Sequence, residues 1–218
     1  DLVMVTTAEK VIDVAITVNE RFRELTEKNC GEPKSISVGI AIAHAKFPFS
    51  SFLSLAEGAL KFAKKEASKR KINNDKRYSE NGLINFMVVN SSSSMDFNDY
   101  YCEELTYSYK DYEFYRTLRP YNIEELKFIQ NTIKNLKSFP LNKLHTLRES
   151  VWLSKNQSLL EGLTVLSRLK CNQRNELNNF LDYFKLEEQD MTFFPWIKRD
   201  KKYFTPFLDL TALYNFIS

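Results

Sequence analysis

Residues 35–64, SISVGIAIAHAKFPFSSFLSLAEGALKFAK, decide how the first half of this chain folds. Residues 35–44 form an apolar run with β-branched side chains, which is typical of a strand in the interior of a sheet. A turn that contains Pro48 follows. From about residue 51 to 70, apolar side chains recur every three or four positions and then give way to a basic cluster. The stretch therefore predicts a buried strand followed by an amphipathic helix.

The flanking segments extend this alternation in both directions. Residues 2–6 are apolar and read as another short buried strand. Helical spacing follows, with a candidate capping box at Thr6 and Glu9 and a stop signal at Gly31. A third apolar strand is expected at residues 83–89. We therefore expect the order β-α-β-α-β, an α/β arrangement with helices packed on a sheet.

The second half of the chain has a different pattern. Asn122 and Glu125 form another candidate capping box, and the residues that follow carry an apolar stripe at helical spacing. Leucine and phenylalanine recur at the same spacing in four further segments. These segments are residues 141–153, 156–170, 173–185 and 206–217. The predicted fold class is therefore α+β: a portion with alternating strands and helices at 1–95, a tyrosine-rich connector at 96–121 and an all-α domain at 122–218.

Composition excludes several classes of protein. The 218 residues are 43% hydrophobic, contain five Gly and six Pro, and carry a net charge of +3. This composition supports a packed core and is not that of a collagen-like or disordered chain. No apolar stretch approaches the roughly 20 residues that span a bilayer. Because the chain starts inside an expected strand and lacks an initial Met, we expect it to be part of a longer protein.

The cysteines and histidines argue against a metal or disulfide scaffold. Cys30, Cys102 and Cys171 are odd in number and far apart, and the chain has two histidines. A disulfide framework or a cysteine zinc site is not expected from this spacing. A reducing, cytoplasmic environment is the simplest expectation.

Two sets of charged residues could bind a nucleotide with its metal. Lys65 and Lys69 lie one helical turn apart, and lysine ammonium groups can neutralise a triphosphate. The alternative is an ordinary solvated helix face. Asp1 precedes the first expected strand, and a carboxylate there could bind Mg²⁺ or be merely a polar residue before the strand. Gly39 in the central strand indicates close approach, either of a ligand or of a packed helix.

The tyrosine-rich connector offers a further alternative. Its tyrosines could stack on nucleic-acid bases, but acidic residues lie among them and would repel a phosphate backbone. A role in packing or in a protein interface fits this composition better.

The sequences of three segments resemble those of a known family. These segments are residues 1–5 (DLVMV), 37–41 (SVGIA) and 56–64 (AEGALKFAK). They resemble the cyclase/polymerase palm superfamily, which includes the diguanylate cyclases. Residues 46–49 (KFPF) look more like the second palm domain of Cas10, the large subunit of type III CRISPR complexes. The helical second half is similar, more loosely, to the C-terminal helical domain of that subunit.

The resemblance implies that residues 1–95 are half of a ferredoxin-like palm. It also implies a set of site residues and ligands. Asp1 would be the last aspartate of a Gly-Gly-Asp-Asp hairpin and would bind Mg²⁺ or Mn²⁺. Lys64 would approach the triphosphate of ATP, supported by Lys65 or Lys69. Ser37 and Gly39 would border the nucleotide pocket.

The implied activity is conditional on residues upstream of Asp1. Cas10 palms join ATP into cyclic oligoadenylate when target RNA is bound, and other CRISPR subunits, the crRNA and the target RNA would be the partners. No membrane role is implied. The alternatives are another palm-superfamily cyclase, such as a diguanylate cyclase-like enzyme, and a degenerate palm that acts as a scaffold. A chain without the first three hairpin residues would be inactive in isolation.

Overall fold

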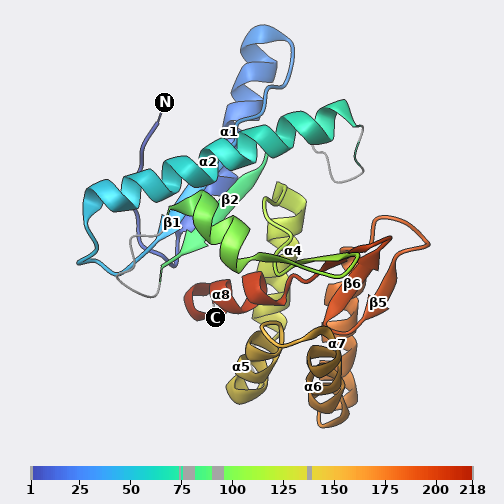
Figure 1. Cartoon of the computed structure of the whole chain (residues 1–218). Helices are drawn as coiled ribbons and strands as arrows, with labels where there is room; N and C mark the ends of the chain where they lie inside the picture. The colour runs from blue at the N-terminus through green and yellow to red at the C-terminus, as the bar shows by residue number, and fades with distance from the viewer. Residues whose placement is uncertain (1, 74, 76–81, 90–95, 137–138, 218) are drawn as a thin grey trace. The chain divides into compact units, whose positions relative to one another are not determined.

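The computed structural model describes residues 2–73, 75, 82–89, 96–136 and 139–217 (Figure 1). The chain divides into two compact units. Unit 1 comprises Asp1–Tyr100 and Arg119–Lys127, and unit 2 comprises Tyr101–Leu118 and Phe128–Ser218. The domain ranges expected from the sequence, 1–95, 96–121 and 122–218, remain a prediction.

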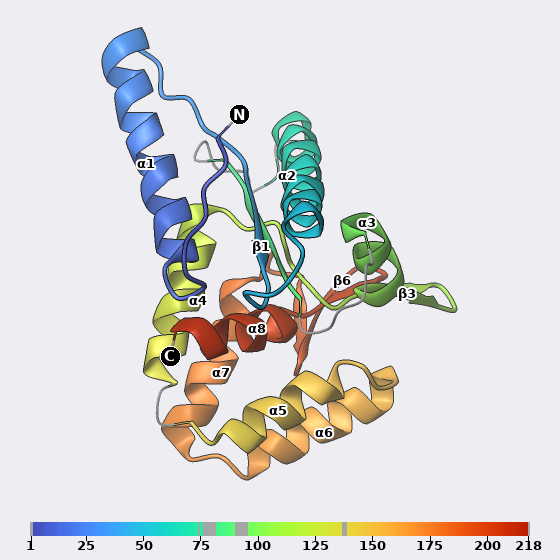
Figure 2. The ribbon, with the colours of Figure 1, turned by 90° about the vertical axis from the view of Figure 1, so that its left-hand side faces the viewer.

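Unit 1 is built on two parallel strands. β1 (Val38–Ile42) pairs with β2 (Ile84–Val88) over all five residues of each strand. α1 (Val11–Cys30) precedes β1, and α2 (Phe49–Ile72) connects the two strands. Figure 2 shows α1 and α2 on opposite sides of β1. The unit also includes the short helix α3 (Phe97–Asp99) and the start of α4 (Ile123–Asn135).

The α+β class is confirmed, and so are the two helices and two of the strands expected in the palm. Residues 2–6 correct the first element of that prediction, because they are not a strand. The side chains of Leu2 and Val5 are 74% and 73% exposed. A strand needs a neighbour that takes its backbone hydrogen bonds, and no strand pairs with this segment among the residues that the structure describes.

The two ends of α1 test two signals in the sequence, the expected capping box and the glycine stop. α1 begins at Val11 after Lys10, with no side-chain cap, so the capping box expected at Thr6 and Glu9 is wrong. Its end is as expected: Gly31 adopts a left-handed φ of 75° and donates its N–H to the Glu27 carbonyl. Glycine adopts this conformation without the steric cost of a Cβ atom.

Unit 2 combines helices with a sheet. Its helices are the rest of α4, α5 (Leu141–Ser150), α6 (Lys155–Ser167), α7 (Cys171–Tyr183) and α8 (Phe207–Ile217). A single π-helical turn spans Tyr100–Glu104 at its border with unit 1. The five strands run in the order β3-β4-β7-β6-β5. They are β3 (Thr106–Tyr109), β4 (Tyr112–Tyr115), β5 (Met191–Phe193), β6 (Trp196–Arg199) and β7 (Lys202–Phe204).

The helices expected in the second half are present, but its description as all-α is incomplete because of this sheet. The strands are three or four residues long, which is too short to produce a clear alternating pattern. The sheet forms only when β4 pairs in parallel with β7, for example Phe114 with Tyr203. That pairing joins segments far apart in the chain.

Aromatic packing joins the sheet to α6. The Phe114 ring stacks between those of Tyr107 and Tyr203, with centroids 4.6 and 4.9 Å away. Trp196 meets Phe114 edge-on, and its indole N–H donates to the Ser158 hydroxyl at 2.8 Å. Tyr107 of the β3–β4 hairpin is therefore a packing residue, whereas Tyr109 is 60% exposed. None of the described helices is both long and apolar enough to cross a membrane.

Candidate nucleotide-binding site

The central feature of unit 1 is the close packing of α2 on β1. A Cβ atom added to Gly39 would lie 2.7 Å from the Leu60 Cβ, and closer still to the backbone of Ala56 and Leu60. Ala59 and Ala63, both fully buried, continue the small-residue face of α2. Of the two explanations that the sequence allowed for Gly39, the structure supports close packing of a helix.

Ser37 precedes β1 and is half-buried. Its neighbour Ile36 is held by the buried amide of Asn19 on α1, which donates to the Ile36 carbonyl at 2.9 Å and accepts the Ile36 N–H at 3.4 Å. This two-point contact positions the entry to β1. The sequence reading did not single out Asn19, because a lone asparagine on a helix has no distinctive local signal.

The three candidate lysines lie on the exposed side of α2. Lys64, Lys65 and Lys69 are all exposed, and the buried stripe of the helix runs through Leu55 and Ala59. At about 100° per residue, Lys65 and Lys69 project only about 40° apart, whereas Lys64 and Lys69 diverge by about 140°. Lys64 and Lys69 therefore do not share one side of the helix.

The lysines also differ in their partners. Lys69 forms an ion pair with Glu66 at 2.6 Å. Lys64 and Lys65 form no ion pair with the residues that the structure describes. Of the three candidate lysines, Lys64 and Lys65 are therefore better placed to bind an anion than Lys69, whose charge is already partly neutralised by Glu66.

The expected metal ligand, Asp1, lies outside the described residues. Within the described ranges, no group of three or more His, Cys, Asp or Glu side chains is arranged to hold a metal ion.

Two buried arginines hold the segment after residue 118 against the rest of unit 1. The sequence analysis did not identify these contacts. Arg70 at the end of α2 donates to the Pro120 carbonyl at 2.8 Å. Arg119 donates to the Phe86 carbonyl of β2 and lies over the Phe86 ring at 4.7 Å. Tyr121 then bridges to Ile84 in an antiparallel pair. The start of α4 is thereby anchored to the β1–β2 sheet.

Comparison with known proteins finds one family. Residues 1–73, which include β1 and all candidate site residues, match the family model described as Cas10/Cmr2, second palm domain. No curated protein matches the chain.

Proposed function

Residues 1–73 are a second palm domain of the Cas10/Cmr2 family, and on that premise we propose that the palm binds ATP with Mg²⁺ and takes part in cyclic oligoadenylate synthesis. The match supports a Cas10-like CRISPR subunit, and membership of the family implies a type III effector complex. Synthesis triggered by target RNA, as part of antiviral defence in the cytoplasm, is the finer part of the proposal. The match over residues 1–73 is the observation that carries it.

The proposed roles follow from charge and position. Lys64 and Lys65 would neutralise the triphosphate, because they are exposed and lack a carboxylate partner among the described residues. Lys69 would give weaker support through its pair with Glu66. Ser37 and Gly39 would border the pocket, with Gly39 acting by letting α2 lie close to β1.

The proposed reaction is attack by a ribose hydroxyl of one ATP on the α-phosphate of another. A P–O bond forms, the bond to the β-phosphate breaks, the hydroxyl proton is released, and pyrophosphate leaves. Asp1 would bind Mg²⁺, which supplies charge neutralisation at the phosphate. The lysines act by binding and orientation.

The first test measures binding of Mg·ATP to the chain by isothermal titration calorimetry. Changing both Lys64 and Lys65 to Ala removes two charges from the exposed side of α2 and should weaken binding about tenfold or more. Lys28→Ala, an exposed lysine on α1, is the matched control and should leave the affinity unchanged. Equal affinities for the double variant and the native chain would exclude Lys64 and Lys65 as triphosphate ligands. Tighter binding of GTP than ATP would favour the other palm-superfamily cyclases.

The second test measures product. A type III effector complex assembled with the polypeptide that contains this chain is given target RNA, Mg²⁺ and ATP, and the products are analysed by mass spectrometry. We expect 2′- or 3′-linked oligoadenylates, and we expect Asp1→Ala to abolish them without loss of the folded protein. A complex that assembles and binds ATP but forms no oligoadenylate would identify the palm as a scaffold.

A further inference from the structure

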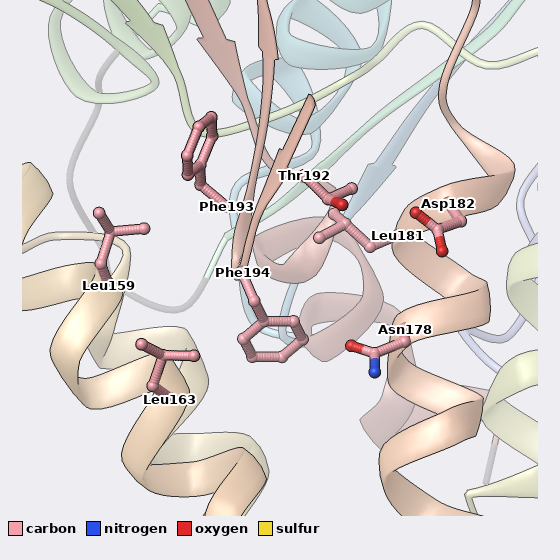
Figure 3. A pocket seen from close by; sticks show the side chains of 8 residues that line it. All are labelled: Leu159, Leu163, Asn178, Leu181, Asp182, Thr192, Phe193 and Phe194. Atoms are coloured by element: carbon pink, nitrogen blue, oxygen red, sulfur yellow. The ribbon is translucent and has the colours of Figure 1, made fainter. Parts of the chain in front are cut away.

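A cleft in unit 2 lies between two helices and the edge of the sheet. Figure 3 shows its walls: side chains of α6 on one side, side chains of α7 on the other, and the end of β5 between them. Its volume is about 450 Å³. The residues that line it are Leu159, Leu163, Asn178, Leu181, Asp182, Thr192, Phe193 and Phe194. Five of these eight side chains are leucine or phenylalanine.

The walls of the cleft are held in place by packing. Gly162 on α6 allows the β5–β6 turn to approach, since an added Cβ would lie 2.9 Å from the Phe194 carbonyl oxygen. The buried Phe194 ring packs against Phe207 of α8, with centroids 5.0 Å apart. At the other end of β5, the buried Asp190 pairs with Arg199 at 3.0 Å. A cleft with walls this constrained does not need to be assembled when a ligand binds.

The strand at the cleft is an open edge. β5 is the last strand in the sheet order, and no strand of the described chain pairs with its outer side. All three of its residues are exposed: Met191, Thr192 and Phe193. Edge strands in soluble proteins are commonly protected by charged residues or proline. β5 contains neither, and its shortness is the one protective feature that it has.

Exposed apolar side chains continue from the strand onto the helix. Met191 and Phe193 on β5 are 56% and 38% exposed, and Leu160 and Leu163 on α6 are 65% and 59% exposed. An open apolar cleft beside an unpaired strand edge offers two kinds of contact to an incoming chain. Backbone groups of β5 can accept a new strand, and the cleft can accept one of its side chains.

A charged residue in the cleft indicates what kind of partner would bind. Asp182 is the one charged residue among the lining residues, so its carboxylate is the group in the cleft that a cation can pair with. Its carboxylate is half-exposed and pairs with Lys185 at 2.7 Å on the same helix. Exposed pairs of this kind contribute little and exchange readily, so an incoming cation can compete for the carboxylate.

We propose that this cleft is a docking site for an extended segment of a partner protein that carries alternating apolar residues and a lysine or arginine. The segment adds as a strand to the free edge of β5. One apolar side chain enters the cleft between Leu163 and Leu181, and the cation pairs with Asp182. A docked helix makes its backbone hydrogen bonds internally and would leave the edge of β5 unpaired. An extended segment can both pair with β5 and place a side chain in the cleft.

The test starts from an unbiased library of displayed heptapeptides selected on the full chain. We expect enrichment of peptides with alternating apolar residues and at least one lysine or arginine. The enriched peptide is then synthesised with a fluorescent label, and its binding is measured by anisotropy. Leu163→Asp places a charge in the cleft and should weaken binding at least tenfold. Leu141→Asp, a comparably exposed leucine on α5, is the matched control and should bind as the native chain does.

Two further readouts separate this proposal from other modes of binding. Hydrogen exchange with the peptide bound should slow at the amides of Met191–Phe193. Asp182→Asn should weaken binding a few-fold at low salt and less at high salt. Protection confined to α6 and α7 would indicate a docked helix and would overturn the proposal. So would a selection that enriches acidic peptides or none, or an unchanged affinity in the folded Leu163→Asp variant.

Discussion

Gly39 of β1 and Leu60 of α2 lie so close that a Cβ atom on Gly39 would stand 2.7 Å from the Leu60 Cβ. Cβ atoms in folded proteins essentially never come that near to another atom. The backbone carbonyl of Ala56 would be nearer still, and backbone cannot move aside as a flexible side chain can. The spacing between strand and helix in unit 1 therefore depends on the absence of a side chain at this position.

Gly39→Ala should lower the free energy of unfolding by about 1–3 kcal/mol, because overpacking forces α2 away from β1. Urea denaturation measures this change. Ser54→Ala, at an exposed position on the same helix, should stay within about 0.5 kcal/mol of the native chain. If Gly39→Ala kept full stability but lost ATP binding, the glycine would serve the ligand rather than the packing.

Asn122 and Glu125 cap the start of α4 reciprocally. The Glu125 N–H donates to Asn122 Oδ1 at 2.8 Å, and the Asn122 N–H donates to Glu125 Oε2 at 2.9 Å. Asn122→Ala should cost about 1–2 kcal/mol in the free energy of unfolding, since the cap lies in a buried setting. Lys134→Ala, exposed near the end of α4, is the comparison and should be nearly neutral. An equal effect of both changes would show that the cap contributes nothing particular.

Ser158 accepts the indole N–H of Trp196, and both side chains are fully buried. Ser158→Ala leaves that N–H without its acceptor, which should cost about 1–3 kcal/mol. Thermal and urea denaturation followed by tryptophan fluorescence measure the change. Ser167→Ala on the exposed side of α6 is the matched substitution and should have little effect. A neutral Ser158→Ala would mean that the indole finds another acceptor.

Tyr115 should titrate above its usual range. Burial raises the pKa of its phenol, and donation of its hydroxyl to Glu113 Oε2 at 2.7 Å raises it further. Because the folded state holds this proton more tightly than the unfolded chain, the stability from Tyr115 is present below pH 10.0 and is lost as the pH rises through the folded-state pKa. Carbon-13 NMR of labelled tyrosine, assigned with Tyr115→Phe, measures the titration.

Glu113→Gln tests the second cause of this shift. The change should lower the pKa of Tyr115 toward its ordinary value without reaching it, because burial is unaltered. Glu149→Gln on α5 should leave the titration unchanged. The pKa of Glu113 is itself lowered, chiefly by the hydrogen bond from Tyr115 and then by Lys202. The contribution of Glu113 is therefore present above pH 4.5 and is lost as the pH falls through its folded-state pKa.

Elements with strong local signals could be predicted from sequence. β1 and α2 follow from their apolar patterns, the end of α1 follows from Gly31, and the cap of α4 follows from Asn122 and Glu125. The contacts at the end of α1 and at the start of α4 join residues close together in the chain, and β1 was visible from its apolar run although it pairs with the distant β2. The candidate cations were visible too, because lysines on a helix can be read directly from the sequence.

Elements that depend on distant partners could not be predicted. Residues 2–6 have the composition of a strand but lack a pairing neighbour among the described residues. β7 is three residues long and exists as a strand because it pairs with β4 and β6. By contrast, the ion pair of Lys69 with Glu66 follows the i, i+3 spacing of a helix, which the sequence itself contains.

The amino-acid sequence alone determined the helices, the β1–α2 unit and the kinship of residues 1–73 with Cas10 palms, because these follow from patterns within a few turns of chain. Only the tertiary structure shows that Gly39 allows α2 to pack closely on β1. Only the tertiary structure shows that the helical half contains a mixed sheet, and that β5 is an unpaired edge strand beside a cleft. Each of these depends on which distant segments come into contact. The spacing of residues along the chain does not indicate those contacts.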